Sequence, residues 1–275
     1  MTFQTPPTPP PPARRHGAPF FVSIATIVVG ACILAGTVVG SGLSAAASLR
    51  DDGQGYASSE TPTVGLTDLD VDVAGGSLTI AYGEVSEAQL DVDGGGPDGW
   101  TFERDGSTLR VSSPHTTFVG WSGTAGSATL FLPRLSSTTD LDARIRVAGG
   151  ALSVDADFGS LDVELAGGNV DLAADVGTLG VSVSGGAASG TLTGVEDATF
   201  EVAGGSLSAT LDGDAPTRTK VTVTAGSADL TLPDEEYNVT TDSGLGRVDN
   251  RLRTSPSATA VVDVEAALGR VSLRS

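Results

Sequence analysis

Residues 161–172 read LDVELAGGNVDL, and this stretch decides the fold. Before its glycine pair, Leu161, Val163 and Leu165 alternate with acidic residues, and the alternation resumes at Val170. An apolar residue at every second position predicts a half-buried β-strand. The glycines predict a corner, because glycine adopts a positive φ at little cost. The stretch therefore predicts two short strands joined by a tight turn.

Variants of this phrase recur about every 20 residues, a period typical of solenoids. The predicted structural turn glycines are Gly75, Gly76, Gly149, Gly150, Gly167, Gly168, Gly185, Gly186, Gly204 and Gly205. Alignment on the second glycine gives two wholly apolar columns, which are Val147, Leu165, Val183, Val202, Val223 and Leu152, Val170, Ala188, Leu207, Ala228. One coil cannot bury its apolar face alone, but stacked coils can. We therefore predict an all-β fold over 64–275, a parallel β-solenoid or β-helix-like stack of short strands.

The same alignment predicts which charged residues face each other. Arg144 is placed beside Asp162, and Arg146 beside Glu164. Opposite charges on neighbouring strands stabilise a sheet slightly, whereas like charges destabilise it. The charge pattern therefore favours the proposed register.

An irregular segment at 97–123 interrupts the repeat. Its first half predicts a hairpin that turns at Asp105-Gly106. Aromatic residues make the segment a candidate for recognition, namely Trp100, Phe102, Phe118 and Trp121. The alternative is a cap over the N-terminal end of the solenoid.

The first 63 residues predict a membrane anchor. Residues 1–17 form a Pro-rich, disordered tail, 18–47 an apolar transmembrane helix, and 48–63 a linker. Arginines before the apolar run place the N-terminus in the cytoplasm and the C-terminal domain outside the cell membrane. Two alternatives remain open, a signal peptide cleaved after Ala47 and lipidation of Cys32.

Within the predicted span, Gly36 and Gly40 form a GxxxG pattern. Small residues at this spacing allow two membrane helices to pack closely. They are candidate packing residues for a homodimer, although glycine is also simply frequent in membrane helices.

The charge balance restricts the partners. The chain has 15 Lys+Arg against 34 Asp+Glu, a net charge of −19, so nucleic acid is excluded because phosphates require basic residues. The repeat predicts that much of the acid gathers at one edge, at Asp155, Asp157, Asp175, Glu196, Asp197, Asp212, Asp214, Asp234, Glu235 and Glu236. The arginine-rich segment 247–275 is expected to be the exposed last coil, whose charges block end-to-end aggregation or else dock an acidic partner.

No residue pattern predicts catalysis, a metal site or a cofactor. The chain has one Cys and two His, which excludes a zinc site of the usual spacing. His115 lacks a nucleophile motif beside it. The acidic residues include no pair singled out at the spacing of a glycoside hydrolase. We therefore expect a protein that is not an enzyme.

Several stretches together resemble a known family. They are LDVDVAGGSLTI, WTFERDGSTLRVSS, SATLFLPR, the repeated GG units, ADLTLP and ALGRVSL. In this order they resemble the bacterial "putative adhesin", β-strand-repeat family, also called the toastrack domain, over about residues 64–275. The resemblance implies a β-solenoid on the outer face of the cell envelope, sometimes linked to envelope stress, and it implies no catalytic residues.

The leading hypothesis is a membrane-anchored envelope protein with a non-catalytic interaction, adhesin-like or scaffold module. Its partner, an envelope polymer or protein, is unknown. Two alternatives stay open, an envelope glycan-cleaving β-helix enzyme and a stress sensor that signals through its membrane helix.

Overall fold

A computed structural model describes residues 56–93, 99–114, 126–134 and 141–275. These residues form strands, turns and connections, which confirms the all-β prediction. Among them there is no helix that is long and apolar enough to cross a membrane. The predicted transmembrane helix at 18–47, with Gly36 and Gly40, lies outside the described residues.

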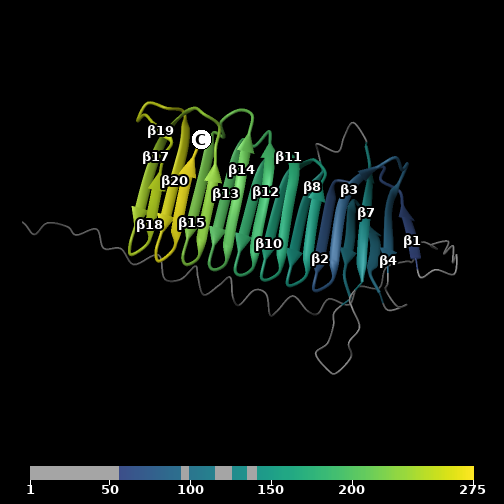
Figure 1. The fold of residues 1–275 in the computed structure, drawn as a ribbon. Helices are drawn as coiled ribbons and strands as arrows, with labels where there is room; N and C mark the ends of the chain where they lie inside the picture. The colour runs from purple at the N-terminus through teal and green to yellow at the C-terminus, as the bar shows by residue number, and fades with distance from the viewer. Residues whose placement is uncertain (1–55, 94–98, 115–125, 135–140) are drawn as a thin grey trace, which may run out of the picture. The chain divides into compact units, whose positions relative to one another are not determined.

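The middle of the domain is a stack of coils, each with one strand in sheet A and one in sheet B (Figure 1). In chain order its strands are β8 (Asp142–Val147), β9 (Ala151–Asp155), β10 (Phe158–Leu165), β11 (Asn169–Val183), β12 (Ala187–Thr193), β13 (Asp197–Val202), β14 (Ser206–Asp212), β15 (Arg218–Val223) and β16 (Ser227–Thr231). The long strand β11 belongs to both sheets, pairing with β9 and β12 in sheet A and with β10 and β13 in sheet B. All these pairings are parallel.

The strand register is the one that the repeat predicts. In sheet B, Leu165 pairs with Val147 on one side and Val183 on the other, and the column continues through Val202 and Val223. The second column pairs in the same way in sheet A. Every residue of both columns is at most 3% exposed. The two apolar columns therefore form the core between the sheets.

The corners repeat one backbone geometry. Gly168 has a φ of +93° and Gly150 a φ of +92°, a region that residues with a Cβ rarely adopt. The N–H of Asn169 donates to the carbonyl of Gly150 at 3.0 Å, so the hydrogen-bond ladder continues through the turn. A Cβ on Gly168 would collide with that carbonyl. Both the dihedral angle and the close stacking therefore require glycine here.

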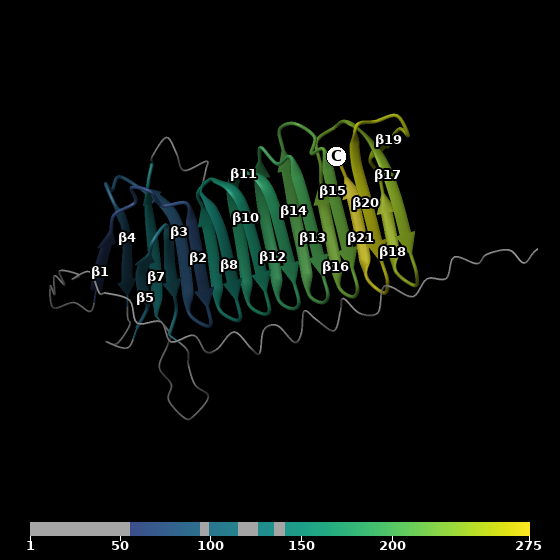
Figure 2. The same cartoon turned by 180° about the vertical axis from the view of Figure 1, so that it is seen from behind.

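At the C-terminal end the coils are not stacked in chain order. The strands are β17 (Glu236–Ser243), β18 (Arg247–Asn250), β19 (Arg253–Thr254), β20 (Ala260–Ala266) and β21 (Arg270–Arg274). Strand β20 lies between β15 and β17 (Figure 1), and β21 lies between β16 and β18 (Figure 2). The expectation that 247–275 forms the exposed last coil is therefore wrong for β20 and β21. The end of the stack is formed by β17, β18 and β19.

Inward side chains explain this order. The inward residues of β20 are apolar, and Val264 and Ala266 are 2% exposed, because strands cover them on both sides. In β17 the equivalent positions become Thr241 and Ser243, which are exposed. A terminal repeat with polar residues covers the apolar core of the coil beneath it and keeps the end of a solenoid soluble. The coil of β17 and β18 therefore serves as the cap, and the more apolar coil lies beneath it.

The N-terminal end has the same inversion. Its strands are β1 (Tyr56–Thr61), β2 (Asp68–Val73), β3 (Ser77–Gly83), β4 (Ala88–Asp93), β5 (Thr101–Asp105), β6 (Thr108–Ser112) and β7 (Ser127–Pro133). The coil of β2 and β3 lies between β6 and β7 on one side and β8 and β9 on the other. Antiparallel strands close the end, β4 and β1 in sheet A and β5 in sheet B.

Two predicted boundaries change at this end. The predicted linker 48–63 contains β1, which pairs with β4. The irregular segment 97–123 contains the predicted hairpin, β5 and β6, with its turn at Asp105-Gly106. Strand β6 is also a regular member of sheet B, because it pairs in parallel with β2.

Candidate functional site

The stack has two outer faces and two long edges, and their side chains differ. We call the outward side of sheet A the hydroxyl face and the outward side of sheet B the charged face. The corner edge contains the glycine turns, and the acidic edge contains the connections at the opposite ends of the strands.

Small, mainly uncharged side chains cover the middle of the hydroxyl face, from β9 to β16. Alternation along the strands directs every second residue outward. On β9, β11, β12, β14 and β16 these residues form three rows across the sheet, which are Ala151, Asn169, Ala187, Ser206 and Ser227; Ser153, Asp171, Ser189, Ser208 and Asp229; and Asp155, Ala173, Thr191, Thr210 and Thr231. None of them is aromatic, Lys or Arg. The rows offer hydroxyl and amide groups at the regular strand spacing of about 4.8 Å.

A shallow hollow of about 440 Å³ lies on this face, across β3, β9, β11 and β12. Its polar lining includes Ser153, Asn169, Asp171 and Ser189. The neighbouring outward positions are occupied by alanines such as Ala151, whose short side chains leave the space open. The hollow can therefore offer several hydrogen-bonding groups to one ligand that lies across the strands.

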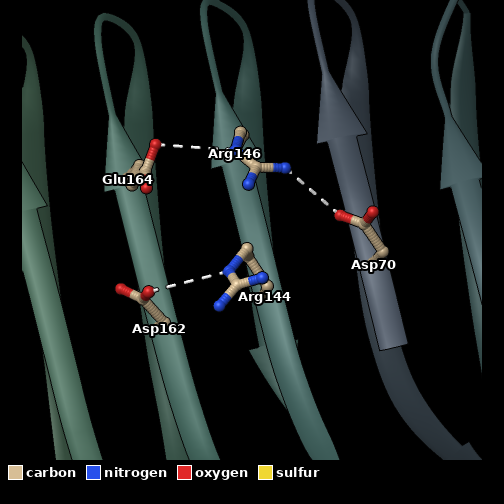
Figure 3. A network of polar contacts seen from close by, with 5 residues as sticks. All are labelled: Asp70, Arg144, Arg146, Asp162 and Glu164. Atoms are coloured by element: carbon tan, nitrogen blue, oxygen red, sulfur yellow. Dashed lines mark hydrogen bonds and ion pairs between the residues drawn. The ribbon is translucent and has the colours of Figure 1, made fainter. Parts of the chain in front are cut away.

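Ion pairs between strands occupy the charged face (Figure 3). Arg144 lies 3.8 Å from Asp162, and Arg146 lies 3.6 Å from Glu164, as the register predicts. Arg146 also lies 3.3 Å from Asp70 of β2, a contact that chain order alone does not indicate. Such partly exposed pairs contribute at most about 1 kcal/mol each. They fix the register and leave these side chains less free for a ligand.

The acidic edge uses some of its carboxylates to join coils. Asp157 accepts a hydrogen bond from the backbone N–H of Asp175 at 3.0 Å, and Asp175 accepts one from the Thr193 hydroxyl at 2.9 Å. Within the described ranges, no three His, Cys, Asp or Glu side chains lie close enough to hold a metal ion. Among these residues the acidic edge is therefore a source of negative charge and not a preformed cation site.

The aromatic residues of the predicted recognition segment are only partly described. Trp100 and Phe102 are half-buried and pack against the core, as a capping role requires. The indole N–H of Trp100 is buried and has no hydrogen-bond partner among the described residues. Phe118 and Trp121 lie outside the described residues.

One titratable group in the core has a shifted pKa. Burial raises the pKa of Tyr237 to about 12, and the charges of Glu235 and Asp234 add to the shift. Its hydroxyl donates to the carbonyl of Pro233 at 2.9 Å. The phenol therefore keeps its proton at neutral pH and supports the connection before β17.

The sequence predictions did not single out the hydroxyl face. They sought function in the acidic connections, the arginine-bearing last coil and segment 97–123. The sequence nevertheless contains the pattern of these rows. The first, third and fifth residues after each corner, such as Asn169, Asp171 and Ala173, are small in most coils. A repeat that alternates core residues with small hydroxyl residues was the signal.

No family model and no curated protein matches the chain. Solved structures similar to it include a putative adhesin from Parabacteroides merdae, at 14% identity and a TM-score of 0.38, covering 82% of this chain and 98% of that one. A putative adhesin from Bacteroides fragilis is 13% identical, with a TM-score of 0.32 and coverage of 79% and 96%. A putative cell adhesion protein from Clostridium sporogenes is 11% identical, with a TM-score of 0.32 and coverage of 80% and 98%. At such low identities and TM-scores, these likenesses do not place the chain in a family.

Proposed function

We propose that this protein is a non-catalytic, membrane-anchored binding module of the cell envelope, and that its hydroxyl face docks an extended, uncharged polymer such as a glycan. The observation that carries the proposal is the hollow lined by Ser153, Asn169, Asp171 and Ser189. Sugar hydroxyls both donate and accept hydrogen bonds, and these side chains offer both kinds of partner.

The regular strand spacing supports an extended ligand. A polymer lying across the strands meets equivalent rows of side chains about every 4.8 Å, so each coil adds a similar small contribution. Linked weak contacts raise the overall affinity without any single tight pocket. The rows on β9, β11, β12, β14 and β16 contain no Lys or Arg, which disfavours a polyanion there, because phosphates and sulfates need basic residues.

Two observations support binding without catalysis. The hollow is lined by a single carboxylate, Asp171, whereas glycoside hydrolysis usually uses a pair. Carboxylates at the acidic edge, such as Asp157 and Asp175, accept hydrogen bonds that join neighbouring coils.

The membrane anchor rests on the apolar stretch 18–47, whose length fits one bilayer crossing. The link to envelope stress stays a prediction.

A co-sedimentation experiment tests this function. The full-length chain in detergent is mixed with insoluble envelope polysaccharide, and the bound fraction is measured. Ala151→Met with Ala187→Met fills the hollow with side chains that cannot hydrogen-bond, so we expect binding to fall at least about tenfold, the equivalent of ~1.4 kcal/mol.

The matched control places the same substitutions on the charged face. Ser182→Met with Thr199→Met changes two outward positions of sheet B and should leave binding unchanged. Equal loss in both variants, or no binding by the unsubstituted chain, would contradict the proposed face. Release of soluble sugar from the polymer would contradict the non-catalytic role.

A further inference from the structure

Two leucines at neighbouring corners project into solvent. Leu245 is 87% exposed and Leu268 is 65% exposed, and their backbone N–H groups remain in the ladder, bonded to Ala267 and Thr224. In five other coils the equivalent position is glycine, at Gly75, Gly149, Gly167, Gly185 and Gly204. Single exposed leucines are ordinary, but two at adjacent corners leave a joined apolar surface in water, which is unfavourable unless a partner covers it.

Two arginines accompany the leucines. Arg247 and Arg270 directly follow the two corners and face each other in register across β18 and β21. Both are exposed, and neither has an ion pair or side-chain hydrogen bond among the described residues. Like charges opposite one another destabilise a sheet. An arrangement that is locally unfavourable on both counts is typical of a functional surface.

The two long edges of the stack carry different charge. Along the described corners, the residues between the inward column and the second glycine are uncharged, including Ala74, Ala148, Ala166, Ser184, Ala203, Thr224, Ala225, Ala267 and Gly244. The acidic residues of the connections lie at the far ends of strands such as β14 (Ser206–Asp212), about 20 Å away at ~3.3 Å per residue. That distance exceeds two Debye lengths at physiological salt, about 8 Å each. The acidic edge therefore repels an anionic surface at the corner edge only weakly. The nearer carboxylates stand one residue before the inward column and face outward from sheet B, such as Glu164, Glu201 and Glu265.

The described chain also begins at the corner edge. Tyr56 pairs with Asp93, and Asp93 pairs with Ser127, which directly follows the corner at Gly126. In the sequence, only residues 48–55 separate Tyr56 from the apolar stretch 18–47. The predicted anchor therefore joins the domain at the corner edge.

We propose that the corner edge lies on the membrane, with Leu245 and Leu268 in the bilayer interface and Arg247 and Arg270 on the phosphates of anionic lipids. This inference rests on the proposed membrane anchor. Arg binds phosphate through paired N–H groups, and leucine gains by leaving water. Ten strand-to-strand steps separate β1 from β18 in sheet A, so this contact lies about 48 Å from the start of the domain.

Two points of attachment hold the stack along the bilayer surface. The anchor keeps the second contact at a high effective concentration, so a weak interfacial contact suffices. Asp242 and Glu265 pair on the sheet B side of the same corners. Because they oppose anionic lipid, the sheet A side, which carries the arginines, is expected to tilt toward the headgroups.

A spin-label experiment tests this orientation. The full-length chain carries Cys32→Ser and one new cysteine, Leu268→Cys or the control Asp214→Cys on the acidic edge, and is reconstituted in nanodiscs of equal phosphatidylcholine and phosphatidylglycerol. Nitroxide accessibility to oxygen and to a water-soluble nickel complex is compared. The label at position 268 should be more accessible to oxygen, which concentrates in the bilayer, and the label at position 214 should be more accessible to the nickel complex, which stays in water. Arg247→Gln with Arg270→Gln should raise the ratio of water-exposed to membrane-bound label at position 268 by about 30-fold, since each basic residue contributes ~1 kcal/mol to membrane binding.

Other outcomes overturn the proposal. A label at 268 as accessible to nickel as the label at 214 contradicts the membrane contact. If the label at position 268 is protected from the nickel complex and also shows spin–spin coupling, the corner contacts a second copy of the chain and not the membrane. Loss of the chain from nanodiscs in alkaline carbonate contradicts the membrane anchor itself, and this inference falls with it. Retention of the anchor with a water-exposed label refutes the orientation alone.

Discussion

The corner glycines give a prediction whose size follows from the structure. Gly168→Ala adds a Cβ at a φ of +93°, which costs roughly 1–2 kcal/mol. The new Cβ also meets the backbone of Gly150 in the preceding coil, which cannot move without displacing that coil. Such overpacking adds about 1–3 kcal/mol. We expect a loss of about 2–5 kcal/mol, a large share of a typical stability of 5–15 kcal/mol.

Two control variants separate the cost of the positive φ from the cost of the collision with Gly150. Gly213→Ala has a similar φ of +100° with nothing within 4 Å of the new Cβ, so it should show the dihedral cost alone. Gly167→Ala has an ordinary φ, and its Cβ lies 3.3 Å from the carbonyl of Ala148, a contact that a small shift relieves. Urea unfolding of the full-length chain, followed by tryptophan fluorescence, measures all three. A Gly168→Ala loss no larger than that of Gly213→Ala would refute the stacked-corner argument.

Three further predictions follow from the core and the strand order. Thr219→Val should stabilise the domain by about 1 kcal/mol in urea unfolding, because the Thr219 hydroxyl is fully buried with no partner among the described residues, and no gain would indicate a partner that the structure does not describe. The pKa of Tyr237 is raised from 10.0 to about 12 in the folded state, so the stability that this phenol contributes is complete below pH 10 and is lost as the pH rises toward 12. Between pH 10 and pH 12, Tyr237→Phe should therefore lose less free energy of unfolding than the unsubstituted chain. An equal loss in both proteins would exclude Tyr237 as the cause. Lys220→Cys with Asp263→Cys should form a disulfide in a chain whose native cysteine is replaced by serine, whereas Lys220→Cys with Thr240→Cys should not, because β20 lies between those two strands; the reverse result would restore stacking in chain order.

Much of the central fold could be predicted from the sequence. The column of Val147, Leu165 and Val183 follows from one alternation anchored on a glycine pair, and the pairs in the structure have that register. Parallel stacking of identical units leaves few alternatives, since a slip by one residue would turn the apolar column outward. The prediction therefore succeeded where every coil repeats the same pattern.

The order of the end coils was harder to predict, because the repeat indicates which residues align and not which coils are neighbours. Its physical signal was nevertheless present. Thr241 and Ser243 place polar residues in the inward column of β17. The residues paired with them in β20, Val264 and Ala266, are apolar, so the coil of β20 and β21 gains more from burial on both sides. The sequence did not predict antiparallel closure by β1, because the residues of β1 lie within the predicted linker 48–63.

The binding surface was missed for a different reason. Charged residues attract attention in a sequence, but on the charged face Arg146 is already paired with Asp70 and Glu164. The small polar residues around Ser153 become informative only when the strands are placed side by side. The binding surface therefore depends on the strand register, which brings residues of different coils into one row.

Photocrosslinking tests the central claim most directly. A benzophenone amino acid replaces Ser153 in the hollow of the hydroxyl face or, as the control, exposed Thr199 on the charged face. The full-length chain is irradiated with envelope polysaccharide, and crosslinked sugar is quantified. The account predicts crosslinks from position 153 and few from 199. Equal yields at the two positions, or a higher yield from 199, would contradict it.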